Sequence, residues 1–260
     1  MKLSVVPLAA LVLAAAAALA DAQVLFTGAY TQDFSSMTGA NATVLPAGWV
    51  VGKGDTTTLG TTGVTSTASS TASGVYEYYG ANTTTKTAVA LGGLSSSGAT
   101  TTVAIVLQLT NNTGASISSL SLSFDALQWA QISGATNTLE FGYYTGATSQ
   151  TKAGFSNYTA ASAFNFISPS STGSGVLSAS AALATSTNVN GTLNLATPWA
   201  NGNVLDLVWY VPATSAGAIA MGIQDVTVNA VPEPSSGALA AGGGALLLAL
   251  GWRRLRPARS

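Results

Sequence analysis

The stretch "TTVAIVLQLTNNTGASISSLSLSFDAL", Thr101–Leu127, decides the fold. Apolar side chains at every second position predict a strand over Thr102–Thr110, and the segment Asn111–Gly114 predicts a turn. Beyond the turn, leucine and phenylalanine alternate with serine over Ser119–Phe124, which is the period of a half-buried strand. These two strands form the clearest pair in the sequence. The core side chains expected from them are Val103, Ile105, Leu107, Leu109, Leu120, Leu122 and Phe124.

Short apolar or alternating runs continue on both sides of this pair, separated by clusters of Gly, Asn, Ser and Thr. Helical periodicity is almost absent between the two ends of the chain. In the last run the parity of the apolar residues changes near Gln224, so we expect a β-bulge there. The pattern predicts an all-β fold, an antiparallel β-sandwich or jelly roll, and favours it over a barrel. Further strands are expected at Gly74–Gly80, Thr138–Tyr144, Gly191–Leu195, Asn203–Val211 and Ile219–Val228.

Residues 23–230 are expected to form one domain, long enough to bury a sizeable core. The Ser/Thr/Gly-rich segment Thr56–Gly74 is interpreted as a long exposed loop and not as a linker, because apolar β runs lie on both sides of it. Three lysines stand against seven acidic residues in this range, so a basic nucleic-acid footprint is absent. The chain has no cysteine and no histidine. These absences exclude disulfides, thiolate or imidazole metal sites and histidine-dependent catalytic triads.

The first 22 residues have the features of a secretory signal peptide. Lys2 is the charged n-region, Leu3–Leu19 is the apolar region, and small residues precede two possible cleavage points, after Ala20 and after Ala22. An uncleaved membrane anchor is the alternative. Signal peptidase is therefore an expected partner of the precursor.

The last 30 residues, 231–260, differ from the domain in composition. Two prolines, Pro232 and Pro234, remove backbone donors, so the last strand must stop and an extended spacer begins. An apolar run of about sixteen residues follows and predicts one transmembrane helix. Four of the eight basic residues then form a stop-transfer signal that keeps the domain outside. The stop-transfer residues are Trp252, Arg253, Arg254, Arg256 and Arg259.

This tail resembles the PEP-CTERM sorting signal of exosortase-processed proteins of Gram-negative bacteria. The motif Val231-Pro232-Glu233-Pro234, the apolar run and the arginines occur in the expected order at the extreme C-terminus, together with a signal peptide. The resemblance implies export, transient anchoring in the inner membrane, recognition by an exosortase, removal of the anchor, and delivery to the cell surface or extracellular matrix. A plain C-terminal membrane anchor is the alternative.

A series of short motifs runs through the middle of the chain. They are, in order, Asp33-Phe34, Leu45–Trp49, Leu91–Leu94 with Ser97-Gly98, Asn111–Gly114 followed by Ile117 and Leu120, Gln128-Trp129 and Ile223–Val226. With these motifs, the middle of the chain resembles an extracellular β-sandwich domain found in many bacterial surface proteins. Relatives tend to carry several aspartates after the tryptophan of the penultimate strand and in the last strand, where this chain retains only Asp225, so the resemblance carries over no cation or sugar binding by that acidic cluster. The resemblance carries no biochemical role.

Candidate site residues between the ends are few. A glycosidase needs two carboxylates roughly 5–10 Å apart, and Glu77, Asp125, Glu140 and Asp206 are the candidates, of which Glu140 and Asp206 could face outward together. No spacing singles out a pair, and solvated strand-face acids are the simpler interpretation. No metal site and no cofactor are expected, because no calcium-type carboxylate cluster occurs.

Aromatic residues offer a second kind of candidate, because an aromatic face can stack on a sugar ring. Trp129 and Trp209 lie in strand-like runs, and we expect both to be buried. Adjacent tyrosines in a strand point to opposite faces, so one ring of each pair could contact a ligand. The pairs are Tyr78 with Tyr79 and Tyr143 with Tyr144.

The sequence therefore indicates an exported, non-catalytic protein of the bacterial surface or exopolysaccharide matrix, sorted and processed by an exosortase. The first alternative is a carbohydrate-binding module that recognises exopolysaccharide. The second is a glycoside hydrolase that depends on carboxylates alone. The expected partners are the sorting enzyme, signal peptidase and, in the first alternative, exopolysaccharide, with membrane contact through the C-terminal helix before processing.

Overall fold

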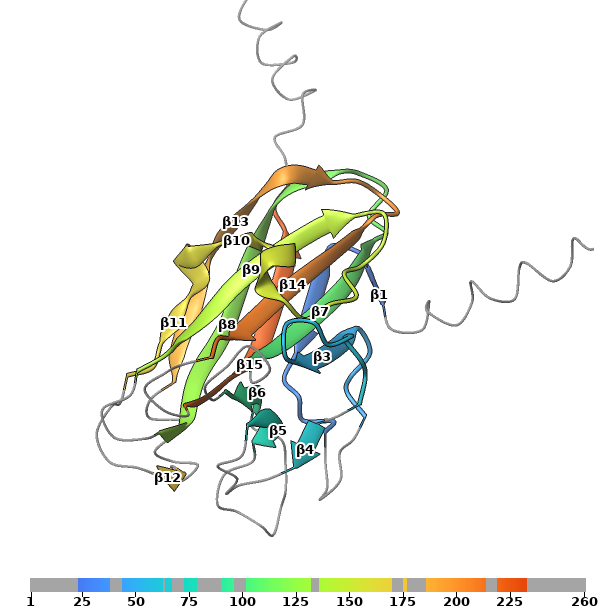
Figure 1. Ribbon diagram of the computed structural model, residues 1–260. Coiled ribbons are helices and arrows are strands. Elements are labelled where there is room, and N and C mark those ends of the chain that lie inside the picture. The colour runs from blue at the N-terminus through green and yellow to red at the C-terminus, as the bar shows by residue number, and fades with distance from the viewer. Residues whose placement is uncertain are drawn as a thin grey trace, which may run out of the picture.

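The computed structural model describes most of the central part of the chain, which forms a β-sandwich of two facing sheets (Figure 1). Within the described ranges, no helix is long and apolar enough to cross a membrane. The expected signal peptide, with Ala20 and Ala22, lies outside the described residues, and so does the expected transmembrane helix. The described residues are 23–37, 44–62, 64–66, 73–78, 90–95, 102–131, 136–169, 175–176, 186–213 and 219–232.

The first sheet has β7 and β14 at its centre. Its strand order is β1-β7-β14-β9-β10, with β3 also paired to β7 and β11 also paired to β9. All of its pairings are antiparallel except that of β1 with β7. The strands are β1 (Val24–Phe26), β3 (Trp49–Lys53), β7 (Val103–Asn111), β9 (Thr138–Gly146), β10 (Thr159–Ala160), β11 (Phe166–Ile167) and β14 (Val204–Val211).

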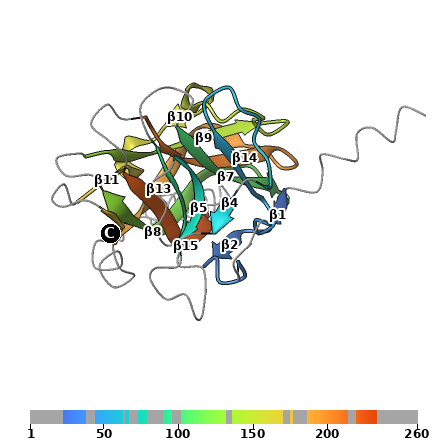
Figure 2. The same ribbon diagram turned by 60° about the horizontal axis from the view of Figure 1, so that its bottom comes forward.

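The second sheet has β8 and β15 at its centre. Its strand order is β12-β8-β15-β6-β5-β4, with β13 also paired to β8 and β2 also paired to β15. Figure 2 shows β8, β13 and β15 on one side of the sandwich and β7, β9 and β14 on the other. The strands are β2 (Ala29–Gln32), β4 (Val64–Ser66), β5 (Gly74–Tyr78), β6 (Ala90–Leu94), β8 (Ile117–Gln131), β12 (Gly175–Val176), β13 (Thr187–Trp199) and β15 (Ala220–Ala230).

The main core fills the space between the two sheets. All seven core side chains expected from Thr101–Leu127 are buried in it. Trp209 lies near its centre, with its ring centroid 5.5 Å from that of Trp49 and 5.4 Å from that of Phe124. Because large aromatic side chains contribute the most apolar area, this cluster accounts for a large share of the burial that stabilises the fold. The burial expected for Trp129 and Trp209 is confirmed.

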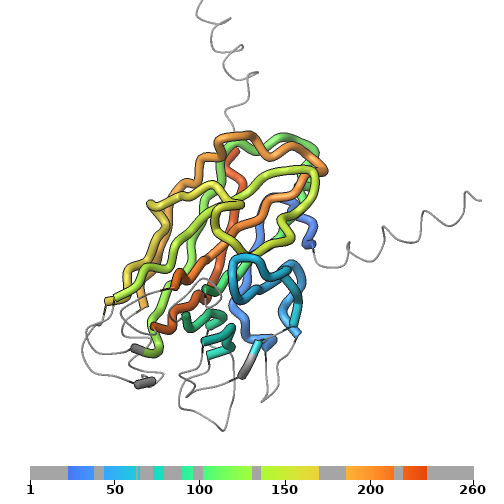
Figure 3. The backbone as a smooth tube through the Cα atoms, in the orientation of Figure 1, coloured from blue at the N-terminus to red at the C-terminus, as the bar shows by residue number. Residues whose placement is uncertain are grey.

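The expectation that the strands of Thr101–Leu127 pair with each other is wrong. β7 belongs to the first sheet and β8 to the second, so the chain crosses from one sheet to the other over one end of the sandwich (Figure 3). The alternation of apolar and polar residues specifies which face of each strand is apolar, but it does not specify which strand lies beside it. The crossing is held by Asn111, whose Nδ2 donates 2.8 Å hydrogen bonds to the carbonyl oxygens of Ala115 and Trp199.

The outer face of the first sheet is also covered. Ala153 and Tyr158 pack on Val106 and Val208, which point away from the main core. The segment after β9, which includes the 3₁₀ turn η4 (Phe155–Asn157), therefore forms a second layer over this sheet. A strand buried on both faces explains why β14 is apolar at nearly every position instead of at alternate ones.

The bulge expected near Gln224 is confirmed. The register between β15 and β8 shifts between Gln224 and Thr227, and Asp225 has a φ of +50°. Ile223 and Val226 both face the core on either side of this shift. The strand ends at Ala230, just before Pro232, as the prolines predict.

Candidate functional site

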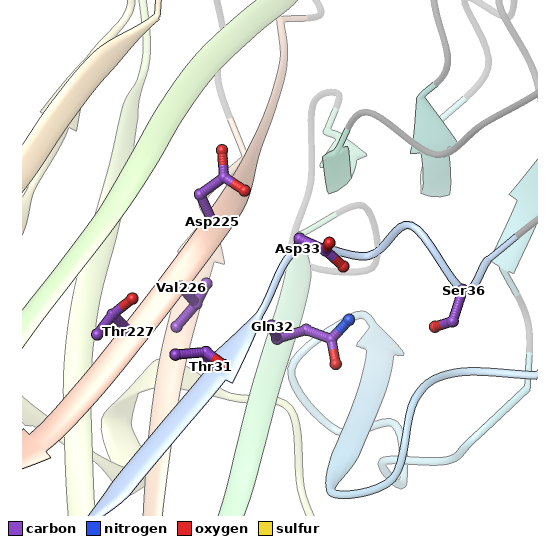
Figure 4. Close-up of a pocket in the computed structure, with 7 residues that line it drawn as sticks. All are labelled: Thr31, Gln32, Asp33, Ser36, Asp225, Val226 and Thr227. Carbon is purple, nitrogen blue, oxygen red and sulfur yellow. The ribbon is translucent and has the colours of Figure 1, made fainter.

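The bulge in β15 marks a change of neighbour along one edge of that strand. Before the bulge, Ala220–Ile223 pairs with β6, and after it, Val226–Asn229 pairs with β2. An open hollow of about 440 Å³ lies at this point. Figure 4 shows Asp225 on β15 and Asp33 just beyond the end of β2. The hollow is lined by Thr31, Gln32, Asp33, Ser36, Asp225, Val226 and Thr227.

The backbone that forms the hollow is locally strained. Among the described residues other than glycine, Phe34 (φ +58°) and Asp225 (φ +50°) have positive φ, a conformation that costs roughly 1–2 kcal/mol for residues other than glycine. The Phe34 ring is fully buried, 4.8 Å from the Trp49 ring in an edge-on arrangement. Core packing of Phe34 therefore holds the turn that places Asp33 beside β15.

Local hydrogen bonds orient the Asp33 side chain. Its Oδ1 accepts from the backbone N–H of Ser35 at 2.9 Å and from the Ser35 hydroxyl at 2.8 Å. These bonds lower the pKa of Asp33 below its usual value because they favour the charged form. Asp33 is therefore ionised at neutral pH and remains exposed at the rim of the hollow.

The environment of Asp225 has the opposite effect. Burial raises the pKa of Asp225, and the negative charges of Asp125 and Asp33 raise it further. Asp125 comes from β8 and accepts a 2.7 Å hydrogen bond from Nδ2 of Asn188 on β13. Three carboxylates from three separate parts of the chain therefore share one electrostatic environment. The lysines of the described residues, Lys53 and Lys152, are absent from the lining of the hollow.

The hollow opens onto a broad polar sheet face. Thr31, Thr227, Ser123 and Asn190 lie side by side across four strands, β2, β15, β8 and β13. The next such row contains Asn229, Ser121 and Thr192. Hydroxyl and amide side chains both donate and accept hydrogen bonds, so this face can hydrogen-bond a polyhydroxylated ligand. Within the described ranges, no group of three or more His, Cys, Asp or Glu side chains is placed to hold a metal ion.

The four carboxylates that the sequence suggested as candidates for a glycosidase pair lie in separate parts of the structure. Glu77 is buried in β5, Asp125 lies beside the hollow, and Asp206 is buried under the outer layer of the first sheet. Glu140 and Asp206 do share the outer face of that sheet, on the neighbouring strands β9 and β14. Glu140 lies beside Tyr210 of β14, however, which is four residues along the strand from Asp206. Four residues correspond to roughly 13 Å along a strand, which exceeds the spacing of a glycosidase pair.

The four candidate tyrosines lie away from the hollow or outside the described residues. Tyr78 is fully buried and stacks on Trp129 with ring centroids 5.0 Å apart. Tyr143 is buried, and its hydroxyl accepts a 2.8 Å hydrogen bond from the backbone N–H of Ala196. Tyr144 is half-buried on the outer face of the first sheet. Tyr79 lies outside the described residues, so Tyr144 is the candidate ring that the described part leaves accessible.

The expected sorting motif is only partly within the described residues. Val231 is half-buried and donates a 3.1 Å backbone hydrogen bond to Ser119, whereas Pro232 is exposed. Glu233, Pro234, Trp252 and the four arginines lie outside the described ranges.

The sequence did not predict that Asp33 and Asp225 lie close together. The two residues are far apart in the sequence, and only the pairing of β2 with β15 brings them together. One signal was present, because the parity break that predicts the bulge falls on Gln224 and Asp225.

Comparison with known proteins supplies no family. No family model matches the chain, and none of the curated proteins matches it. Among solved structures, the K3 cleaved adhesin domain of Lys-gingipain from Porphyromonas gingivalis is 14% identical, with a TM-score of 0.42 over 77% of this chain and 98% of that one. The carbohydrate-binding module TmCBM61, solved with β-1,4-galactotriose, is 11% identical, with a TM-score of 0.35 over 77% of this chain and 99% of that one.

A similar structure also occurs inside a larger protein. The enzymatically active domain of bacteriophage CBA120 tailspike protein 4 is 12% identical, with a TM-score of 0.34 over 77% of this chain. This chain spans 21% of the length of that one. At these identities the similarities concern the β-sandwich architecture alone.

Proposed function

We propose that this chain is an exported, non-catalytic protein of the bacterial surface or exopolysaccharide matrix, and that its β-sandwich binds carbohydrate. The observation that carries the binding role is the hollow at the β15 bulge, where Asp33 and Asp225 flank an opening of about 440 Å³ on a hydroxyl- and amide-rich face. This volume is within the roughly 300–1,000 Å³ typical of small-ligand sites.

The chemistry of the lining suits sugar hydroxyls. Carboxylate oxygens accept charge-assisted hydrogen bonds from hydroxyl protons, and the Gln32 amide and the Thr31 and Ser36 hydroxyls both donate and accept. The negative charges at Asp33, Asp125 and Asp225 disfavour acidic sugars. A neutral polysaccharide segment is therefore the ligand class that fits the hollow.

Titration calorimetry with neutral polysaccharide fragments tests this role. We expect Asp33→Asn and Asp225→Asn each to weaken binding at least about tenfold, which corresponds to 1.4 kcal/mol. Glu140→Gln is the matched control, because it removes one carboxylate from the opposite sheet and leaves the hollow intact. Equal affinity in all four proteins, or no binding by the wild-type protein, would refute the assignment.

A hydrolase is the second candidate, and one observation favours it at this position. The pKa of Asp33 is lowered while the pKa of Asp225 is raised, and carboxyl groups with opposed shifts are the arrangement that acid–base catalysis uses. Asp225 would be the acid and Asp33 the base or nucleophile. Release of reducing ends from polysaccharide, abolished by Asp225→Asn, would replace the binding role with this one.

We also propose that the tail directs exosortase sorting, as its resemblance to PEP-CTERM signals implies. In support, the last strand ends at Ala230 and the chain is exposed at Pro232, so a processing enzyme could reach the spacer. Intact-mass measurement of surface-extracted protein tests this. A mature form lacking everything beyond the spacer near 232–236 is expected. Mature protein that still carries Trp252 and the arginines would show a permanent anchor.

A further inference from the structure

Strand β13 is an open edge of the second sheet. Thr187–Asn194 and Trp199 of this strand pair with β8 along one side, and no other strand of the described part pairs with it. Nine of its residues are exposed, so solvent reaches most of the strand. An edge of this kind presents unpaired backbone N–H and C=O groups that can accept another strand.

Over Thr187–Asn194, β13 lacks the features that usually protect such an edge. Its sequence TNVNGTLNLATPW contains no charged residue, and its proline, Pro198, is the second-to-last residue. The register with β8 is continuous over Thr187–Asn194 and shifts only between Asn194 and Trp199. Charged side chains, prolines within the strand and bulges are the features that normally prevent edge-to-edge pairing. Eight residues of regular strand are therefore open to pairing.

The two faces of β13 match a second copy of themselves. Leu193 and Val189 point toward the core, and Val189 is only partly buried there. Asn188, Asn190 and Thr192 belong to the outer polar face, because they pair with Asp125, Ser123 and Ser121 of β8. A two-fold axis between antiparallel strands keeps outer side chains beside outer ones and core-facing side chains beside core-facing ones. Because the strand is uncharged, no repulsion opposes this pairing.

We propose that β13 pairs antiparallel with β13 of a second copy of this chain, joining two second sheets into one continuous sheet. The joined sheet extends the polar face on which the hollow lies and covers the partly buried Val189. The dimer does not depend on carbohydrate, so this inference stands apart from the proposed binding role.

Charge placed on the edge tests the dimer in the purified full-length protein. Analytical ultracentrifugation is expected to show a dimer for the wild type. The double variants Asn190→Lys/Thr192→Lys and Asn190→Glu/Thr192→Glu should each dissociate at least tenfold more readily, because like charges meet across the two-fold axis. An equimolar mixture of the two variants should restore dimers, and native mass spectrometry should identify them as mixed.

The matched control is Ser121→Lys. Ser121 is exposed on the same face and pairs with Thr192, but it lies inside the sheet on β8. This variant should remain dimeric, and circular dichroism of all variants should retain the β-sheet spectrum. A monomeric wild type would overturn the proposal. So would a dimer that persists in both double variants, since that dimer would form through another surface.

Discussion

The backbone N–H of Gln150 donates a 2.6 Å hydrogen bond to Oδ2 of Asp206, beneath the segment that covers the outer face of the first sheet. Asp206 is fully buried, and its other oxygen, Oδ1, has no hydrogen-bond partner among the described residues. Burial raises the pKa of Asp206 to about 6. Burial therefore disfavours the charged form, and the Asp206 carboxyl stays neutral up to about pH 6.

This burial predicts that stability falls as pH rises from about 4 to 6. An acid whose pKa is raised on folding stabilises the fold below its unfolded pKa, near 3.8, and loses that contribution as pH rises through about 6. A shift of this size corresponds to about 3 kcal/mol. We expect Asp206→Asn to remove most of this dependence. Urea denaturation at several pH values between 4 and 8 measures it.

The control for this prediction is Asp33, whose pKa shifts in the opposite direction to that of Asp206. The pKa of Asp33 is lowered in the fold, so any contribution from Asp33 is lost as pH falls, not as it rises. Asp33→Asn should therefore leave the loss of stability between pH 4 and 6 in place. If Asp206→Asn and wild type followed parallel curves across this range, the buried carboxyl would not be its source.

The strained bulge predicts an unusual order of substitutions at Asp225. Glycine adopts positive φ without steric cost, whereas alanine does not, and alanine also lacks the polar side chain that lets Asp tolerate it. We expect Asp225→Gly to be more stable than Asp225→Ala by about 1 kcal/mol. Thermal unfolding of the two variants compares them directly, with both lacking the carboxylate. Equal stability would show that the bulge relaxes to negative φ.

Strand positions and facing directions could be predicted from this sequence, because side-chain alternation reports them directly. The seven expected core residues of β7 and β8 and the bulge at Gln224 are in this class. Strand partners could not be predicted. β7 and β8 each satisfy their backbone hydrogen bonds with strands from elsewhere in the chain, β14 and β15 among them, and no local pattern encodes that choice.

The candidate site depends on strand partners, which the sequence pattern does not encode. Asp33, Asp125 and Asp225 become neighbours only through the order of the strands, so their spacing in the sequence carries no signal. The same limit applies to Tyr78 and Tyr144, which pack in clusters outside the main core. Alternation shows that adjacent tyrosines face opposite sides of a sheet, but it does not show that both sides are covered. Burial of the outer faces depends on loop segments whose paths lack periodicity.

Two glycines beneath the Trp129 ring are expected to be irreplaceable. A Cβ at Gly92 would overlap the Met221 carbonyl oxygen and the Trp129 ring, and a Cβ at Gly222 would lie 2.5 Å from that ring. Backbone and a fully packed indole cannot move aside cheaply, so we expect Gly92→Ala to cost about 3 kcal/mol. Gly60→Ala is the control, since nothing lies within 4 Å of its Cβ position. Chemical denaturation that found equal stability for the two variants would mean that the sheet shifts to admit the methyl group.

A last prediction concerns the wall of the hollow formed by β2. The indole N–H of Trp49 donates a 2.7 Å hydrogen bond to the hydroxyl of Tyr30, and Trp49 is fully buried. Tyr30→Phe keeps the ring but leaves that N–H without its acceptor, which costs about 1–3 kcal/mol. Tyr144→Phe is the control, because it removes a hydroxyl from a half-buried ring on the outer face of the first sheet. It should change stability by less than about 0.5 kcal/mol.

Because Tyr30 anchors β2 from the core side, loss of its hydroxyl should lower the melting temperature without changing which sugars the folded protein binds. Calorimetric unfolding and sugar titration of the two variants measure both effects. A Tyr30→Phe protein as stable as Tyr144→Phe would show that Trp49 finds another acceptor, and that β2 is held by its backbone pairing with β15 alone.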